Sequence, residues 1–221
     1  MTVSVGRYGV IVPVKPPAGA KSRLAGLGEN ARARLAAAFA ADTVDAALRA
    51  RGVRCVLAVT DDHTLARTLS QLGADVIPDG VSEDLNGALV QAALELGRRS
   101  GADVSPVALC ADLPALRVED LEGALDRAAG RGLSFVADAE GVGTTMVAAE
   151  DVTTFRPLFG NGSRAAHDQV DAYEIDVPAA TLRRDVDTPA DLADALALGV
   201  GPRTAHVVST LLPHLLPSPT R

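Results

Sequence analysis

Residues 9–14 read Gly-Val-Ile-Val-Pro-Val, a short and continuous apolar run near the start of the sequence. A run of this kind is typical of a strand that is covered on both faces, as in a parallel sheet between two layers of helices. Helical patterns and further apolar runs alternate after it as far as residue 129. Helices that separate consecutive strands predict βαβ crossovers and a mostly parallel sheet.

This alternation predicts strands at 9–14, 53–59, 74–77 and 107–110, and helices at 29–50, 62–72, 85–99 and 118–129. The pattern then changes. Strand-like residues 134–137 and 145–149 are separated by a glycine-rich connection that is too short for a crossover helix. We therefore expect an antiparallel strand or hairpin in this part of the sheet.

The C-terminal part of the sequence predicts a short helix at 164–168 and a late strand at 173–177. A further helix begins with a Thr188 cap and with Pro189 at its first position. Together the elements predict a single three-layer αβα domain with a Rossmann-like sheet. We place this domain at residues 1–204, followed by a tail at residues 205–221 that is partly ordered or forms a packing arm.

The composition excludes several classes of protein. The chain has 221 residues, a formal charge of −7, 48% hydrophobic residues and 22% charged residues, as expected for a folded soluble domain. No apolar run reaches the roughly 18 residues that span a membrane, and the N-terminus lacks a secretion signal. The two cysteines lie in apolar runs and favour reduced thiols in the cytoplasm. An acidic chain with 3% aromatic residues is also a poor nucleic-acid binder.

A loop rich in small residues follows the first strand and contains both lysines of the chain, Lys15 and Lys21, together with Arg23. Open α/β sheets bind ligands at the carboxyl ends of their strands. Three cations beside exposed backbone amides suit a triphosphate. The spacing matches neither a Walker A loop nor a Rossmann fingerprint. Chance clustering in a solvated loop is the alternative.

Aspartates follow two other predicted elements. Asp112 comes directly after the strand at 107–110 and precedes a rigid proline turn, a suitable place for a Mg²⁺ ligand. Asp185 and Asp187 alternate in an extended segment, so they share a face. One of them is expected to complete the metal site while the other caps or braces the helix at Pro189. Ordinary turn and helix-start roles remain the alternatives.

Glycine-rich loops around Gly141 and Gly160 combine backbone amides with hydroxyl groups, which suits a small anion, although each is more often an ordinary turn. Asn86 opens a helix and is a candidate for a base or ribose contact, or for a cap. His167 is the only histidine near these segments. No Ser–His–Asp or Cys–His grouping is apparent.

Taken together, the strings Ala-Asp-Leu-Pro-Ala-Leu at 111–116 and Asp-Val-Asp-Thr-Pro-Ala-Asp-Leu at 185–192, with the loops above, resemble the CofC/FbiD family. These proteins are guanylyltransferases of deazaflavin coenzyme F-420 biosynthesis. Their fold is similar to that of molybdenum-cofactor guanylyltransferases and other nucleotide-diphospho-sugar transferases. The resemblance runs from about residue 9 to residue 204. It implies an enzyme that joins GMP from GTP to phosphoenolpyruvate or 2-phospho-L-lactate.

The resemblance also implies roles for individual residues. The metal-binding aspartates match Asp112 and Asp185, with Asp187 close by. The positions that bind phosphoenolpyruvate match Thr144, Gly160 and Ser163. The nucleotide-phosphate loop matches Lys15, Lys21 and Arg23, with Asn86 as a further nucleotide contact. Catalysis then consists of positioning and charge neutralisation by Mg²⁺ and these cations, without a general base, because the acceptor phosphate is already ionised.

Several alternatives stay open. Another nucleotidyltransferase with a different acceptor and a non-catalytic nucleotide-binding module are both compatible with the sequence. The choice among phosphoenolpyruvate, 2-phospholactate and 3-phosphoglycerate is undecided, as is the metal role of Asp185 against Asp187. The apolar pairs at 207–208 and 211–212 are candidates for a homodimer contact. Hand-off of the product to the next enzyme of the pathway is a further expectation.

Overall fold

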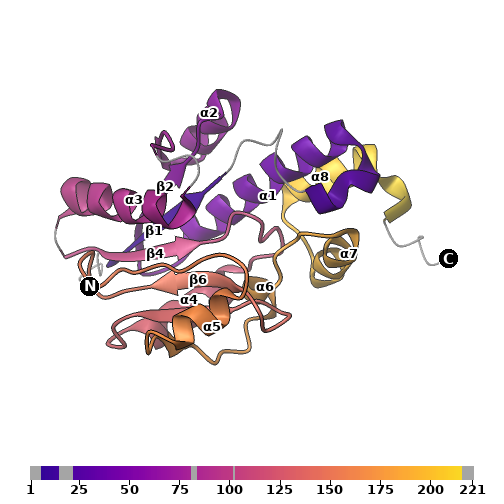
Figure 1. The fold of residues 1–221 in the computed structure, drawn as a ribbon. Helices are drawn as coiled ribbons and strands as arrows, with labels where there is room; N and C mark the ends of the chain where they lie inside the picture. The colour runs from indigo at the N-terminus through magenta and orange to yellow at the C-terminus, as the bar shows by residue number, and fades with distance from the viewer. Residues whose placement is uncertain (1–5, 15–21, 81–83, 102, 216–221) are drawn as a thin grey trace.

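The computed structural model describes residues 6–14, 22–80, 84–101 and 103–215. They form one seven-stranded sheet with the order β3-β2-β1-β4-β6-β5-β7 (Figure 1). The strands are β1 (Tyr8–Pro13), β2 (Val53–Val59), β3 (Asp75–Ile77), β4 (Ser105–Leu109), β5 (Ser134–Ala137), β6 (Thr144–Ala148) and β7 (Tyr173–Glu174). The predicted α/β fold is confirmed.

Strand β6 is the reversed strand that the short connection predicted. It pairs antiparallel with β4 and with β5, whereas β1 pairs parallel with both β2 and β4. Its reversal brings its first residue, Thr144, to the edge of the sheet at which β4 and β5 end. The backbone N–H of Cys110, directly after β4, donates to the Thr145 carbonyl over 2.9 Å. This edge carries the loops that the sequence marked as functional.

Strand β7 is shorter than the predicted strand at 173–177. Its pairing with β5 ends after the hydrogen bond from Ile175 N to the Phe135 carbonyl, over 2.8 Å, because arginine side chains bind the carbonyls that follow. The Ile175 carbonyl accepts a hydrogen bond from the Arg183 guanidinium over 3.2 Å. The next carbonyl, that of Asp176, accepts one from Arg127 over 2.8 Å. Carbonyls that are satisfied by side chains need no further strand beside them.

Helices cover both faces of the sheet. They are α1 (Glu29–Arg49), α2 (His63–Leu72), α3 (Leu85–Ser100), α4 (Val118–Ala128), α5 (Ser163–Asp168), α6 (Ala180–Arg183), α7 (Pro189–Leu198) and α8 (Pro202–Leu211), with 3-10 turns η1 (Ser22–Leu27) and η2 (Pro213–Leu215). Val10 and Val12 of β1 pack on the face covered by α1, α2 and α4. Ile11 points to the opposite face and packs with α3, as the period of two in a strand requires.

A third apolar cluster joins α1 to the C-terminal helices. Helix α8 lies beside α1 in the fold (Figure 1). Leu35 and Phe39 of α1 pack there with Val207 and Val208 of α8 and with Leu212. The boundary expected after residue 204 therefore falls inside α8. Val207, Val208 and Leu212 were among the residues proposed for a homodimer contact. That expectation is wrong for these three residues, because the chain's own core buries them.

Two further expectations concern the surroundings of the protein. None of the helices in the described ranges has both the length and the apolar character needed to cross a membrane. Cys55 and Cys110 are half-buried and carry thiols instead of forming a disulfide.

Candidate active site

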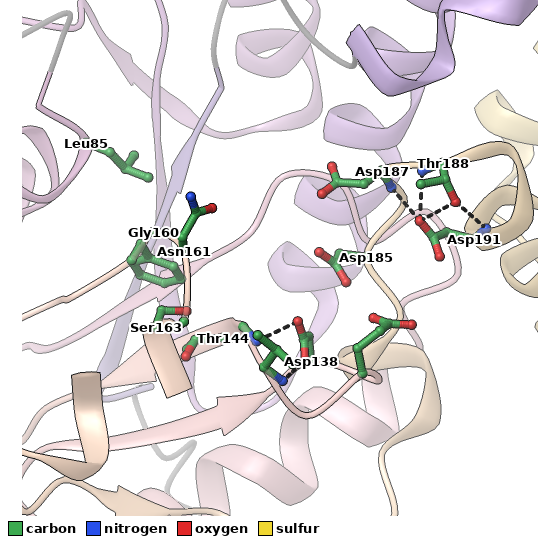
Figure 2. A pocket seen from close by; sticks show the side chains of 15 residues that line it. Leu85, Asp138, Thr144, Gly160, Asn161, Ser163, Asp185, Asp187, Thr188 and Asp191 are labelled. Atoms are coloured by element: carbon green, nitrogen blue, oxygen red, sulfur yellow. Dashed lines mark hydrogen bonds between the residues drawn. The ribbon is translucent and has the colours of Figure 1, made fainter. Parts of the chain in front are cut away.

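A cavity of about 790 Å³ opens at the edge of the sheet where β5 ends and β6 begins. Its walls come from five segments: the β5–β6 loop, the first residue of β6, the loop that leads into α5, the segment at the start of α7, and Leu85 at the start of α3 (Figure 2). The lining includes five residues that the sequence proposed, namely Thr144, Gly160, Ser163, Asp185 and Asp187. The fold thus brings to one pocket the three residues proposed for the acid substrate and two of the three proposed metal ligands, whereas Asp112 is not part of the lining.

Three carboxylates gather on one side of this cavity. Ligand oxygens of Asp138, Glu140 and Asp185 all lie within 4.8 Å of one another. Oxygen donors at this spacing fit a hard divalent cation such as Mg²⁺ or Mn²⁺. Sequence reasoning found Asp185 and missed the other two. The signal was present, since Asp138 and Glu140 alternate just after β5 in the same way as Asp185 and Asp187.

Asp138 also shapes the loop that carries it. Its two carboxylate oxygens accept hydrogen bonds from the backbone N–H groups of Val142, over 2.9 Å, and Gly143, over 2.7 Å. A Cβ atom at Gly143 would come within 3.2 Å of the Asp138 carboxylate carbon, and closer still to one of its oxygens. Only glycine therefore lets the loop close over this carboxylate.

The segment before α7 is held by Asp191. One oxygen of its carboxylate accepts hydrogen bonds from Asp187 N over 3.1 Å, Thr188 N over 2.7 Å and the Thr188 hydroxyl over 2.9 Å. Thr188 and Asp191 form a reciprocal capping box, which confirms the predicted Thr188 cap. The carboxylate of this cap comes from Asp191 and not, as expected, from Asp185 or Asp187. Those two residues line the cavity instead.

Arg184 connects the two acidic segments. Its guanidinium lies 2.7 Å from a Glu140 oxygen, 3.3 Å from an Asp191 oxygen and 3.5 Å from an Asp194 oxygen. Burial lowers the pKa of Arg184, but the Glu140 hydrogen bond and the three negative charges outweigh it, so the pKa is raised. Arg184 thus ties the β5–β6 loop to the start of α7 and partly balances the acidic wall.

Asp112, the third predicted metal ligand, is connected to this wall through the backbone. Its carbonyl accepts a hydrogen bond from Val186 N over 3.0 Å. Thr43 of α1 holds the Asp112 loop from the other side. The buried Thr43 hydroxyl donates to the Ala111 carbonyl and accepts from Leu113 N, each over 3.2 Å. A side chain of the helix layer therefore fixes the backbone on both sides of Asp112.

We expect Thr43→Val to lower the free energy of unfolding by about 1–3 kcal/mol, because two backbone groups beside Asp112 lose their partner. Thr204→Val is the matched control. Thr204 is also fully buried, but its hydroxyl has no hydrogen-bond partner in the part of the chain that the structure describes. Its replacement should be close to neutral. Urea unfolding of both variants tests this, and equal losses would contradict the role given to Thr43.

The opposite wall of the cavity holds the residues proposed for a small anion. Thr144 begins β6, Ser163 begins α5, and both are buried. Gly160 has a φ of 143°, which favours glycine at this exposed turn. Asn86 of α3 holds the turn in place. Its amide nitrogen donates to the Phe159 carbonyl over 3.0 Å, and its amide oxygen accepts from Phe159 N over 2.8 Å.

The side chains of the three proposed cationic residues lie outside the described part of the structure. Lys15 and Lys21 lie outside the described residues, and the description of Arg23 in η1 does not extend to its side chain. Their approach to the cavity stays a prediction. In the described part of the chain, the lining of the cavity contains five carboxylates and no basic side chain.

Solved structures with low sequence identity share the fold of this chain. A Desulfovibrio desulfuricans G20 protein assigned to the nucleotide-diphospho-sugar transferases has a TM-score of 0.68 at 16% identity, over 95% of this chain and 98% of that one. A Methanothermobacter nucleotidyl transferase has a TM-score of 0.57 at 17% identity, over 92% and 98%. The chain has the fold of nucleotidyltransferases.

Sequence comparison narrows this class to one family. The model described as "Guanylyl transferase CofC like" matches residues 8–211, and the chain belongs to this family. A phosphoenolpyruvate guanylyltransferase of Thermomonospora curvata is 50% identical over 206 residues, which are 92% of this chain and 90% of that protein. The protein of the same name from Streptomyces scabiei is 48% identical over 213 residues, 93% and 98% of the two chains.

Proposed function

We propose that the protein transfers GMP from GTP to the phosphate of phosphoenolpyruvate, giving enolpyruvoyl-2-diphospho-5'-guanosine and pyrophosphate for coenzyme F-420 biosynthesis. The proposal rests on one observation: in a chain of this family, residues proposed for the acid substrate and residues proposed for the metal line the same cavity. The residues matched to the acid substrate, Thr144, Gly160 and Ser163, line one wall, and Asp185 and Asp187 line the other (Figure 2).

The charge of the cavity supports a requirement for divalent metal. Five lining carboxylates would repel a triphosphate and a phosphorylated acid unless cations lie between them and the substrates. Asp138, Glu140 and Asp185 fit such a cation by donor type and spacing, and Asp112 and Asp187 are the other proposed ligands. A bound Mg²⁺ would supply charge neutralisation at the phosphates. Lys15, Lys21 and Arg23 are proposed to bind along the triphosphate.

The proposed reaction needs no general base. An oxygen of the phosphoenolpyruvate phosphate, already ionised near neutral pH, forms a bond to the α-phosphorus of GTP. The bond from the α-phosphorus to the β-phosphate bridge breaks, and pyrophosphate leaves with the electron pair. The task of the protein is to hold the two anions in line. Thr144 and Ser163 bind the acid. Asn86 holds the Phe159–Gly160 turn next to the acid and is also a proposed nucleotide contact.

Both substrates and the product are polyanions of the cytoplasm, where we place the protein. The product contains a phosphoric anhydride and keeps the carboxylate and enol of the acid. We expect the next enzyme to bind this product and to break the anhydride, with the nucleoside monophosphate as the leaving group. This is consistent with a hand-off of the product.

The proposal predicts a defined product. Purified protein is incubated with Mg²⁺, one of the four nucleoside triphosphates, and phosphoenolpyruvate, 2-phospholactate or 3-phosphoglycerate. We expect pyrophosphate release and a guanosine diphosphate conjugate, identified by mass spectrometry, with GTP and phosphoenolpyruvate. A conjugate of another base or acid would replace the proposed substrates. GTP binding without pyrophosphate release would instead support a non-catalytic nucleotide-binding module.

A further inference from the structure

His167 lies behind the anion wall and contacts three of its segments. Its side chain is fully buried. The Nδ1 atom lies 2.8 Å from the Ser163 carbonyl oxygen and 3.2 Å from the Thr144 hydroxyl oxygen. On the other side of the ring, Leu158 N lies 3.0 Å from Nε2. One imidazole thus joins β6, α5 and the loop between them.

The Leu158 contact determines where the imidazole carries its proton. A backbone N–H can only donate, so Nε2 must accept with a lone pair. The ring proton of the neutral imidazole is therefore on Nδ1, where the Ser163 carbonyl accepts it. An imidazolium would place a second N–H against Leu158 N–H. Burial also lowers the pKa of His167, and the hydrogen bond to Ser163 has the opposite, smaller effect.

This tautomer fixes the direction of the Thr144 hydroxyl. Because Nδ1 carries a proton, it cannot accept one from Thr144. The hydroxyl oxygen instead shares the Nδ1 proton, and its own hydrogen points elsewhere. Among the described residues, the hydroxyl has no hydrogen-bond partner other than His167, and Thr144 lines the cavity. We propose that His167 is a positioning residue that turns the Thr144 hydroxyl into a hydrogen-bond donor for an anionic oxygen of the phosphorylated acid.

Ring packing holds the imidazole in this orientation. It stacks on Phe135 of β5, with centroids 5.2 Å apart and an angle of 22° between the rings. Phe159, which lines the cavity, meets it edge-on at 6.1 Å. Two aromatic contacts thus fix the ring in addition to its hydrogen bonds. The Nδ1 atom is therefore held at one position beside the Thr144 hydroxyl. The inference rests on the proposed function for the identity of the acid, but not for the tautomer.

The first test measures the tautomer itself. Long-range ¹H–¹⁵N NMR spectra of the histidine rings should show one imidazole with a protonated Nδ1 and an unprotonated Nε2. His167→Gln assigns this signal by its disappearance. A protonated Nε2, or a fully protonated ring at neutral pH, would overturn the proposal. This result does not depend on which acid the enzyme uses, so it also stands if phosphoenolpyruvate proves to be the wrong substrate.

The second test separates the two sides of the ring by steady-state kinetics. Asn at position 167 can supply an N–H near Nδ1, whereas Gln can supply an acceptor near Nε2. We expect His167→Gln to raise the KM for phosphoenolpyruvate by about tenfold or more, the value of a hydrogen bond to a charged group. The KM for GTP should change by less than about twofold, and His167→Asn should recover much of the loss. Equal increases in both KM values would indicate a general structural role and overturn the proposal.

Thr144→Val and Thr145→Val complete the second test. The two threonines are neighbours in β6 and both buried, but the Thr145 hydroxyl has no hydrogen-bond partner among the described residues. Thr145→Val should leave the KM for phosphoenolpyruvate unchanged. Thr144→Val should raise it, and adding His167→Gln should raise it little further, because His167 acts through that hydroxyl. Additive effects of the two changes would contradict the proposal.

Discussion

Asp185→Asn is expected to lower kcat for pyrophosphate release by about 100- to 1,000-fold, the scale of one lost electrostatic contact in a transition state. Asp185 is a predicted metal ligand and also one of the three carboxylates, with Asp138 and Glu140, whose oxygens lie within 4.8 Å of one another. The replacement keeps the size of the side chain and removes its charge. The remaining carboxylates then hold a divalent cation less tightly, and the substrate phosphates lose charge neutralisation.

A Mn²⁺ titration followed by electron paramagnetic resonance provides a readout independent of turnover. Asp185→Asn should weaken Mn²⁺ binding by about tenfold or more. Asp75→Asn is the control, because Asp75 is an exposed aspartate at the first residue of β3, an edge strand. Near-native turnover and Mn²⁺ affinity in a folded Asp185→Asn protein would refute the metal assignment.

Asp42→Ala is expected to lower the free energy of unfolding by about 2–4 kcal/mol, because two backbone N–H groups at the start of α8 lose their acceptor. The cap residue of α8, Gly201, has no side chain to satisfy them. Asp42 of α1 does so instead, accepting from Arg203 N over 3.2 Å and from Thr204 N over 2.8 Å. A Cβ atom at Gly201 would lie 2.7 Å from the Asp42 Cβ, so glycine permits this approach.

Two variants test this interpretation by urea unfolding. Asp42→Asn retains one acceptor oxygen and should cost about half as much as Asp42→Ala. Asp45→Ala, one turn along the same helix, removes a carboxylate whose ion pair within the described ranges is with the exposed Arg49. It should change stability by less than about 0.5 kcal/mol. Similar losses for Asp42→Ala and Asp45→Ala would show that helix α8 does not depend on the buried carboxylate.

The elements that the sequence predicted well are those set by local interactions. The connection between β5 and β6 is too short for a crossover helix, and this predicted the reversed strand. The Thr188 cap was predicted from the residues around it. The length of β7 was not predictable in this way. It depends on Arg127 and Arg183, which reach the carbonyls after Glu174 from other elements.

The candidate site divides in the same way. Asp112 and Asp185 were proposed because each follows a recognisable pattern and resembles a family motif, and of the two only Asp185 lines the cavity. Asp138 and Glu140 have a similar alternating pattern. Only the tertiary structure shows that the loop after β5 lies close to Asp185, so that the three carboxylates form one group. A carboxylate becomes part of a metal site through neighbours that are distant in sequence.

The amino-acid sequence alone therefore determined the alternation of strands and helices, the reversed strand, and the family of enzymes to which the chain belongs. These depend on periodicity and on short motifs, which act over a few residues. The tertiary structure decided which carboxylates meet, that Asp42 caps α8, and which nitrogen of His167 carries the proton. Each of these depends on hydrogen bonds or charges between distant segments, whose positions are fixed only when the sheet and its helices pack together.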